Sequence, residues 1–367
     1  MKIAIIGSRG IPARYGGFET FVEKISEILV KAGHAVSVYG EKDNAVNLKT
    51  LNGVEIKESD YKKSLNPLLF YFDSLRKSRF GYDIVLVCGV GGAPFYFLFK
   101  NKHSVIISNV DGLEHLRTKY SYLKKLFVRL AQRMARKYSD LIIADSKEVG
   151  NFWAHYLRCP TEKLKVITYG AEAVNPFEQK YLDQYYLIKD TYYIVVARLV
   201  PENHIQEIIQ GYLKSESEKK LVIIGGLENT KYVNDLRQFE NDNILFCNAI
   251  YHKETLDSLR QGAFGYIHGH SVGGTNPSLL EAMAASCLCI CHDNIFNREV
   301  NSEEQLYFRN AEDLSRRIHE VEKLNDKQRS SLQHASYQRV IQNYSWEKIG
   351  EQYLQLFDEI YEGKHRI

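Results

Sequence analysis

The chain of 367 residues has no apolar run that approaches the ~20 residues of a membrane-spanning helix. Gly, Lys or Asp interrupts every hydrophobic stretch, and residues 1–10 lack the pattern of a secretory signal. Low-complexity tracts are also absent, which excludes a largely disordered chain. These absences predict a folded protein that stays in the cytosol.

The six cysteines lack the spacing of a structural zinc site. Three are scattered, while Cys287, Cys289 and Cys291 alternate along one apparent strand. Alternating thiols could hold a metal or a redox centre, but free cysteine commonly packs as a small buried hydrophobe. We therefore expect reduced thiols with a structural role.

Length and pattern together indicate two domains, because one hydrophobic core seldom organises so long a chain. Short β-branched runs alternate with helical patterns, which is typical of a parallel sheet covered by helices. The first set of predicted strands covers residues 2–6, 35–39, 83–88, 104–108, 141–144 and 165–168. The pattern restarts after residues 175–186, with strands at 193–197, 221–224, 244–246, 264–268 and 287–291. The predicted fold is α/β, with Rossmann-like domains at residues 1–175 and 176–345 facing each other across a cleft.

Charge is divided unequally between these halves. Residues 1–175 hold 27 Lys and Arg against 17 Asp and Glu, a net charge of +10, whereas the remainder holds 21 against 28, a net charge of −7. Residues 116–139 contain eight basic residues and no acidic one, with apolar side chains at helical spacing. An amphipathic basic helix suits an anionic membrane surface, and an ordinary core helix with a solvated face is the open alternative. Nucleic acid is a weaker choice, because no binding motif accompanies the charge.

Two loops that join a strand to a helix carry the chemistry. The first, residues 7–20, contains Arg9, Arg14, Tyr15, Gly16 and Gly17. Glycines let backbone amides approach an anion at a helix N-terminus, so this loop favours a phosphate or an acceptor over an ordinary turn. Its spacing is not that of a nicotinamide-binding loop.

The second loop, residues 268–284, is the more informative one. Pro277 marks a helix start, and the amides of Ser278 and Leu279 are expected to be free to bind a diphosphate. Glu281, one turn into that helix, is expected to reach ribose hydroxyls. Further candidate donor contacts in the loop are His270, Gly274, Thr275 and Asn276.

This second loop resembles the donor-binding motif of GT-B glycosyltransferases in family 4. The opening loop is similar to that of a bacterial, rhamnosyltransferase-like branch with a DUF1972-type N-terminal domain. The segment Ala197-Arg198-Leu199-Val200-Pro201-Glu202 and the closing Ser345-Trp346-Glu347 agree with the same family, so the resemblance spans nearly the whole chain. It implies that a final helix at about 346–367 packs back on the first domain.

The resemblance implies specific roles by position. Arg198 pairs with the donor diphosphate, a task that suits its planar guanidinium, and Asn203 is a further donor contact. Asp111, Glu114 and Arg198 are the implied catalytic residues, and the implied acceptor side comprises Arg9, Arg14, Tyr15, Glu19, Asp111 and His115. Because the family pattern places Gly16 and Gly17 near the phosphates, both count as donor-binding residues.

Two positions depart from the family pattern. Many members have a second glutamate eight residues before Glu281, where this chain has Gly273. The usual lysine shortly after the phosphate-binding arginine is also absent, and only Asn203 and His204 stand there. No Asp-x-Asp pair occurs, which predicts catalysis without a metal clamp and without a cofactor beyond the nucleotide sugar.

The leading hypothesis is transfer of a sugar, rhamnose first, from a nucleotide diphosphate such as dTDP to a lipid-linked saccharide. Such an enzyme would act in cell-surface polysaccharide or capsule synthesis, as a peripheral protein on the inner face of the membrane. The resemblance also implies a retaining, metal-independent reaction. Two alternatives are a sugar-nucleotide epimerase of the same fold and a non-catalytic nucleotide-sugar-binding subunit.

Overall fold

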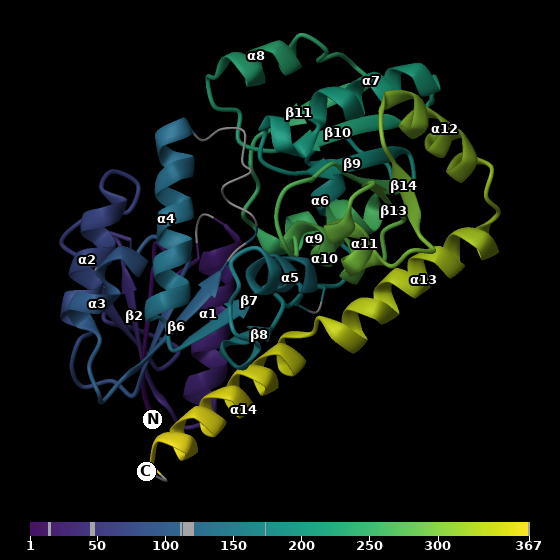
Figure 1. Ribbon diagram of the computed structural model, residues 1–367. Coiled ribbons are helices and arrows are strands. Elements are labelled where there is room, and N and C mark those ends of the chain that lie inside the picture. The colour runs from purple at the N-terminus through teal and green to yellow at the C-terminus, as the bar shows by residue number, and fades with distance from the viewer. Residues whose placement is uncertain (14–15, 45–47, 111, 113–120, 173, 366–367) are drawn as a thin grey trace. The chain divides into compact units, whose positions relative to one another are not determined.

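The computed structural model describes residues 1–13, 16–44, 48–110, 112, 121–172 and 174–365, which divide into two compact units (Figure 1). Unit 1 comprises Met1–Tyr169 and Trp346–Ile367, and unit 2 comprises Gly170–Ser345. The boundary therefore follows residue 169 and not residue 175. Ala171 forms a parallel bridge with Ser345, and its amide donates to the carbonyl of Tyr344 at 2.7 Å. The two ends of unit 2 thus lie side by side.

Unit 1 is built on an eight-stranded sheet in the order β3-β4-β2-β1-β5-β6-β7-β8. Its strands are β1 (Lys2–Ile6), β2 (Ala35–Gly40), β3 (Thr50–Leu51), β4 (Val54–Glu58), β5 (Ile84–Cys88), β6 (Val105–Val110), β7 (Leu141–Ala144) and β8 (Leu164–Val166). Only β3 is antiparallel to its neighbour. The strand order reverses at β1, because β2 lies on one side of it and β5 on the other.

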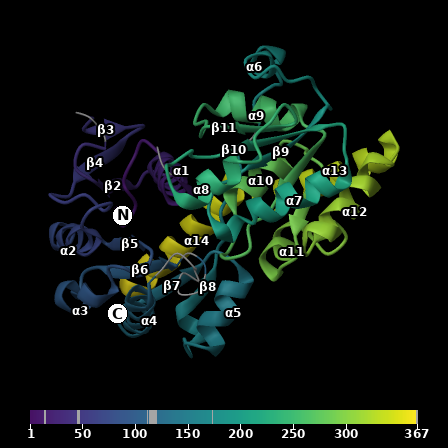
Figure 2. The same cartoon turned by 90° about the horizontal axis from the view of Figure 1, so that it is seen from above.

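Several helices belong to unit 1 with this sheet. They are α1 (Gly17–Lys31), α2 (Pro67–Lys77), α3 (Tyr96–Phe99), α4 (Tyr122–Tyr138), α5 (Lys147–His155) and α14 (Trp346–His365). α14 lies beside α1, although the whole of unit 2 separates them in sequence (Figure 1). α3 packs against both α2 and α4 (Figure 2). The final helix is thus part of the first unit.

Unit 2 has a six-stranded parallel sheet in the order β11-β10-β9-β12-β13-β14. Its strands are β9 (Tyr192–Val196), β10 (Lys220–Ile224), β11 (Ile244–Cys247), β12 (Gly265–His268), β13 (Cys289–His292) and β14 (Leu306–Phe308). This is the doubly wound order of the Rossmann fold, with the reversal between β9 and β12. The predicted fold class is confirmed.

The helices of unit 2 pack on both faces of that sheet. They are α6 (Gln179–Asp183), α7 (Ile205–Ser215), α8 (Lys231–Arg237), α9 (Lys253–Gly262), α10 (Pro277–Ala284), α11 (Ile295–Asn301), α12 (Ala311–Glu322) and α13 (Asp326–Asn343). α7 lies against α12 (Figure 2) and α10 against α13. The hydroxyl of Tyr192 donates to Leu259 of α9, while that of Tyr193 donates to Glu322 of α12, as expected for neighbours in a strand that point to opposite faces.

Most predicted strands are found within one or two residues of their predicted ends, and residues 2–6 and 141–144 match. The sequence pattern did not predict β3, β4 and β14. Among the described residues, no helix combines the length and the apolar character needed to cross a bilayer.

Tyr353 anchors α14 in unit 1 and offers a test of that packing. Its side chain is fully buried, its ring lies 5.5 Å from that of Phe21, and its hydroxyl accepts a hydrogen bond from Asn109 at 2.9 Å. Tyr353→Phe should lower the free energy of unfolding by about 1–3 kcal/mol, because the buried Asn109 amide loses its acceptor. Tyr353→Ala should cost about 3–5 kcal/mol. Urea denaturation measures both, and an unfolding curve unchanged in Tyr353→Ala would contradict the packing role of α14.

Candidate functional site

The carboxyl ends of β9 and β12 form the reversal point of the unit 2 sheet. In open parallel sheets the loops after these two strands diverge and leave a crevice for a ligand. Arg198 follows β9 directly, and the loop of residues 269–276 connects β12 to α10. The fold therefore brings together the two segments of the sequence that carry the predicted donor contacts.

Arg198 has the properties of an anion-binding residue. Its side chain is exposed, and its guanidinium has no hydrogen-bond or ion-pair partner among the residues that the structure describes. Its main chain, in contrast, is held firmly. The side-chain amide of Asn203 donates to the carbonyl of Arg198 at 2.7 Å, and the amide of Val200 donates to the same carbonyl at 2.9 Å.

Asn203 uses both ends of its side chain. It ends a short 3₁₀ turn, Pro201–Asn203, and is 6% exposed. Because its nitrogen donates to Arg198, its oxygen Oδ1 faces the Nδ1 atom of His270 at 2.7 Å and accepts from it. Asn203 was predicted as a donor contact, and the structure places it as the link between Arg198 and His270.

His270 is also held through its main chain. Its carbonyl accepts hydrogen bonds from Asn294 at 3.0 Å and from Asn297 at 2.9 Å, both on or beside the start of α11. The same two side chains bond the carbonyl of His292. Sequence patterns could not reveal this role, because α11 follows a different strand, β13.

The start of α10 corrects one prediction. The amides of Ser278 and Leu279 are not free: the first donates to the side-chain oxygen of Asn276 at 2.9 Å and the second to the carbonyl of Asn276 at 3.1 Å. Asn276 is an N-cap, and it satisfies the groups that were expected to bind a diphosphate. Within the described part of the chain, the amides of Gly274 and Asn276 have no hydrogen-bond acceptor. The available donors therefore lie just before the helix and not inside it.

Three predicted contacts of this loop, Ser278, Thr275 and Leu279, are partly or fully buried. The hydroxyl of Ser278 donates to the carbonyl of Val196 at 2.8 Å, where it ties α10 to the end of β9, and it lies 2.8 Å from the hydroxyl of Tyr266. Thr275 is 4% exposed, and the Leu279 side chain is fully buried.

Glu281 is fixed by a residue that the sequence did not single out. The guanidinium of Arg260, on α9, donates to Oε2 of Glu281 at 2.6 Å. Arg260 is 2% exposed, whereas Glu281 is 41% exposed. Burial alone would lower the pKa of Arg260, but the charge of Glu281 raises it above its usual range. A buried cation thus orients one carboxylate oxygen and leaves the other face of Glu281 toward solvent.

Four histidines lie beside this loop: His204, His268, His270 and His292. Burial, reinforced by His270 and His292, lowers the pKa of His268 well below its usual range. Burial and the proximity of His204 lower the pKa of His292 to about 4. These two rings are therefore neutral near pH 7.

His204, Glu207 and His292 are close enough to be considered as metal ligands. Nδ1 of His204 lies 2.8 Å from Glu207, and Nε2 lies 2.9 Å from the Ser271 hydroxyl. Both ring nitrogens of His204 therefore already have a hydrogen-bonding partner in this arrangement.

The glycine-rich loop of unit 1 follows β1 at the reversal point of its own sheet. Gly7 has a φ of +97°, and a Cβ there would lie 2.4 Å from the carbonyl oxygen of Cys88. The carboxylate of Glu19, 5% exposed, accepts from the amide of Arg9 at 2.8 Å. Glu19, predicted on the acceptor side, thus holds the shape of the loop.

The other predicted residues of unit 1 divide into two groups. Arg9 forms an ion pair with Glu41 at 3.2 Å. Gly16 is the N-cap of α1, and Gly17 is its first residue. The remaining predictions lie outside the described residues: Arg14, Tyr15, Asp111, Glu114 and His115.

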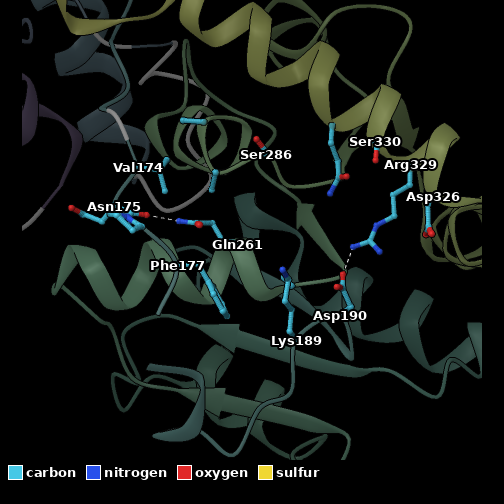
Figure 3. Close-up of a pocket in the computed structure, with 15 residues that line it drawn as sticks. Val174, Asn175, Phe177, Lys189, Asp190, Gln261, Ser286, Asp326, Arg329 and Ser330 are labelled. Atoms are coloured by element: carbon cyan, nitrogen blue, oxygen red, sulfur yellow. Dashed lines mark hydrogen bonds and ion pairs between the residues drawn. The ribbon is translucent and has the colours of Figure 1, made fainter. Parts of the chain in front are cut away.

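A pocket of about 600 Å³ in unit 2 lies elsewhere (Figure 3). Its lining includes Lys189 and Asp190 before β9, Ala263 before β12 and Ser286 before β13, so it opens at the amino ends of the strands. Arg329 of α13 forms an ion pair there with Asp190, and Gln261 donates to the carbonyl of Asn175. The lining contains none of the predicted site residues that the structure describes.

Comparison with known families agrees with this arrangement. Residues 183–339 match the family described as glycosyl transferases group 1. Residues 1–60 and 70–172 match a domain of unknown function, DUF1972. No curated protein sequence is similar enough to the chain to count as a relative.

Solved structures share the fold at low sequence identity. Sucrose-phosphate synthase from Thermosynechococcus elongatus superposes with a TM-score of 0.81 at 15% identity, over 99% of each chain. HepE from Anabaena, in complex with UDP and glucose, gives 0.77 at 16% identity, over 98% of this chain and 100% of that one. A glycosyltransferase from Rickettsia africae gives 0.76 at 14% identity, over 98% of each chain.

These findings define the class of protein: the chain is a glycosyltransferase with the two-domain GT-B fold. The group 1 family match lies in residues 183–339, and the DUF1972 match lies in the N-terminal half of the chain.

The buried histidines predict that stability depends on pH. His268 and His292 stay neutral in the folded protein, while in the unfolded chain they take up protons near their ordinary pKa of 6.5. Their contribution is therefore complete above pH 6.5 and is lost as the pH falls toward about 4. The melting temperature should fall across this window, and His292→Gln should flatten the decline. Asp293, whose pKa the Arg298 hydrogen bond lowers to about 2, loses its contribution only at lower pH. A melting temperature constant from pH 6.5 to 4.5 would contradict the neutral histidines.

Proposed function

We propose that unit 2 binds the diphosphate of a nucleotide sugar with Arg198 and the loop of residues 269–276. The observation that carries the proposal is the exposed guanidinium that follows β9: no described residue pairs with it, and no described residue accepts from the amides of Gly274 and Asn276 in the loop beside it. A permanently charged, planar group suits a phosphate better than any other side chain. Glu281, held by Arg260, is then positioned to accept hydrogen bonds from the hydroxyls of the ribose.

The proposed chemistry follows from where charge develops. When the bond between sugar and phosphate breaks, negative charge builds on the leaving phosphate, and fixed donors stabilise it most effectively. Arg198 and the amides of Gly274 and Asn276 are such donors in unit 2. We infer a retaining reaction without a metal, as the family resemblance implies, with the acceptor held by unit 1.

The proposed donor sugar follows from two resemblances. HepE has been solved with UDP and with UDP-glucose, which supports a nucleotide sugar as the co-substrate here. The opening loop resembles that of rhamnosyltransferase-like proteins, and this resemblance favours rhamnose carried on dTDP. The proposed acceptor is a lipid-linked saccharide used in cell-surface polysaccharide synthesis.

The surface of α4 supports an acceptor at a membrane. This helix buries mainly small side chains, Val128, Ala131 and Ala135, and exposes large apolar ones. The exposed fractions are 78% for Tyr122, 75% for Leu123, 50% for Leu126 and 51% for Leu130. Basic residues flank them, with no acidic residue on the helix. An apolar strip between cations favours the interface of an anionic lipid bilayer over a solvated face.

Substitution of Arg198 tests the catalytic proposal. Arg198→Ala should lower acceptor-dependent release of nucleotide by roughly 10²- to 10³-fold, the usual effect of removing one preorganised donor. Arg198→Lys should restore part of the rate, because it returns the charge without the planar pair of donors. The assay uses a panel of nucleotide sugars with lipid-linked saccharides, and product analysis distinguishes transfer from epimerisation.

Arg316→Ala is the matched control, because Arg316 is an exposed arginine of unit 2 whose partner is Asp313 on its own helix. Its turnover should equal that of the wild type. Undiminished turnover in Arg198→Ala would refute the assigned role.

Binding to lipid vesicles tests the surface of α4. Replacing Lys124, Lys125, Arg129 and Arg133 with Gln should weaken binding to phosphatidylserine vesicles more than roughly tenfold, since each basic residue near such a surface contributes about 1 kcal/mol. The pair Leu126→Ser and Leu130→Ser should weaken it as well.

The matched control is the pair Leu68→Ser and Leu69→Ser on α2. These leucines are 42% and 44% exposed, but they are not on the basic helix. Equal binding by all three variants in a sedimentation assay would remove α4 as the membrane contact.

A further inference from the structure

The pocket of about 600 Å³ in unit 2 has no part in the proposed donor site (Figure 3). It opens at the amino ends of the strands, whereas Arg198 and the loop of residues 269–276 follow the carboxyl ends of β9 and β12. Its volume falls within the range of roughly 300–1,000 Å³ that small-molecule sites occupy. The lining residues decide which class of molecule it suits.

The first step concerns the room in the pocket. Ala263, Ala284 and Ala285 line it and are buried, so small side chains stand where larger ones would fill the space. Residues 174–175 lie on one side of the pocket and α13 lies on the other (Figure 3). All lining residues belong to unit 2, so the pocket is formed within a single unit.

The second step concerns charge. The charged residues of the lining are Lys189, Asp190, Asp326 and Arg329, and their formal charges cancel. Arg329 is already compensated, because it forms an ion pair with Asp190 and donates to the carbonyl of Phe264 at 3.2 Å. A phosphate or carboxylate ligand would find no surplus of positive charge here and would also meet Asp326. The lining therefore favours an uncharged ligand.

The third step concerns hydrogen bonding. The Nε2 atom of Gln261 donates to the carbonyl of Asn175 at 2.7 Å, and the Nδ2 atom of Asn175 donates to Asp257 at 2.9 Å. Each of these two amides thus keeps its side-chain oxygen as an acceptor. Ser286 and Ser330 are exposed in the lining, and their hydroxyls can both donate and accept. A ligand with many hydroxyl groups matches such a mixture.

The fourth step concerns Phe177, the aromatic residue of the lining. Its ring is partly exposed, and Nζ of Lys189 lies 5.2 Å from the ring centroid. The face of an aromatic ring is electron-rich, so it attracts a cation and also the weakly positive C–H groups of a sugar ring. An aromatic surface beside hydroxyl and amide groups suits a saccharide.

We propose that this pocket binds an uncharged saccharide, with the C–H groups of one sugar ring against Phe177 and its hydroxyls bonded to Asn175, Gln261, Ser286 and Ser330. The site is separate from the reaction and involves no covalent step. In the cell the ligand is a segment of the saccharide that the enzyme extends. That identity rests on the proposed function, whereas the binding itself does not.

Titration of the full chain by ligand-observed NMR tests the proposal. Maltohexaose, cellohexaose and an α-linked rhamnose trisaccharide are the neutral probes, and inorganic phosphate is the charged one. At least one neutral probe should bind with a dissociation constant on the order of 1 mM, because an open pocket makes few contacts. Raising the salt concentration from about 0.1 M to about 1 M should change this constant less than about twofold, since salt screens charges and not hydroxyl contacts.

Variants locate the bound saccharide. Phe177→Ala should weaken its binding about tenfold, as expected for a lost aromatic contact, whereas Phe177→Tyr should keep it. Ser330→Ala, on an exposed position of α13, should weaken it severalfold. The matched control is Tyr251→Ala, because Tyr251 is an aromatic residue of unit 2 that is 72% exposed and does not line the pocket. Tyr251→Ala and Arg198→Ala should both bind the saccharide as the wild type does.

Four results would overturn the proposal. The first is a wild-type protein that binds none of the neutral probes at about 10 mM. The second is wild-type affinity in both Phe177→Ala and Ser330→Ala. The third is loss of saccharide binding in Arg198→Ala, which would move the ligand to the other ends of the strands. The fourth is phosphate that binds more tightly than every saccharide and is released by salt. Failure of the proposed function looks different, because Arg198→Ala would then keep its turnover while Phe177→Ala still lost the saccharide.

Discussion

The site of unit 2 depends on the side-chain amide of Asn203, which joins two segments that lie far apart in the sequence. It can do so because β9 and β12 are neighbours in the sheet, paired through Tyr193 with Gly265 and Ile194 with Tyr266. The approach is close: a Cβ on Gly269 would lie 2.1 Å from the carbonyl oxygen of Asn203. Glycine at 269 is therefore a requirement of the fold, and the placement of Arg198 relative to His270 follows from it.

A second constraint is the buried cation of Arg260. Removing a guanidinium from water is costly, and a single ion pair often fails to compensate for the cost. The partner here, Glu281, is half exposed, and Nε of Arg260 has no hydrogen-bond partner in the described chain. Stability alone is a poor explanation of such an arrangement. The consequence that we can identify is functional, since Arg260 holds a carboxylate of α10 in one position next to the loop that precedes this helix.

The sequence predicted what depends on local pattern and missed what depends on tertiary contacts. Apolar runs located residues 2–6 and 141–144 as strands, because all of these residues except Lys2 are buried. The sequence pattern did not predict β4. This strand is largely unburied, and its residues Val54-Glu55-Ile56-Lys57-Glu58 do not form an apolar run. The amides of Ser278 and Leu279 were expected to be free, but Asn276 competes for them locally. His270 was predicted, whereas Asn294 and Asn297 come from another strand connection and could not be.

Charge shows why the site must work through short-range contacts. Residues after 175 carry a net charge of −7, yet the proposed ligand of unit 2 is itself an anion. The long-range field of this half would repel a nucleotide sugar, since like charges disfavour encounter. The two nearby buried histidines are neutral near pH 7 and add no charge. Arg198 and the backbone amides must therefore attract the nucleotide sugar, and their effect is short-ranged. In unit 1 much of the excess positive charge lies on α4. A surface with many negative charges, such as an anionic bilayer, can attract all of these basic residues at once.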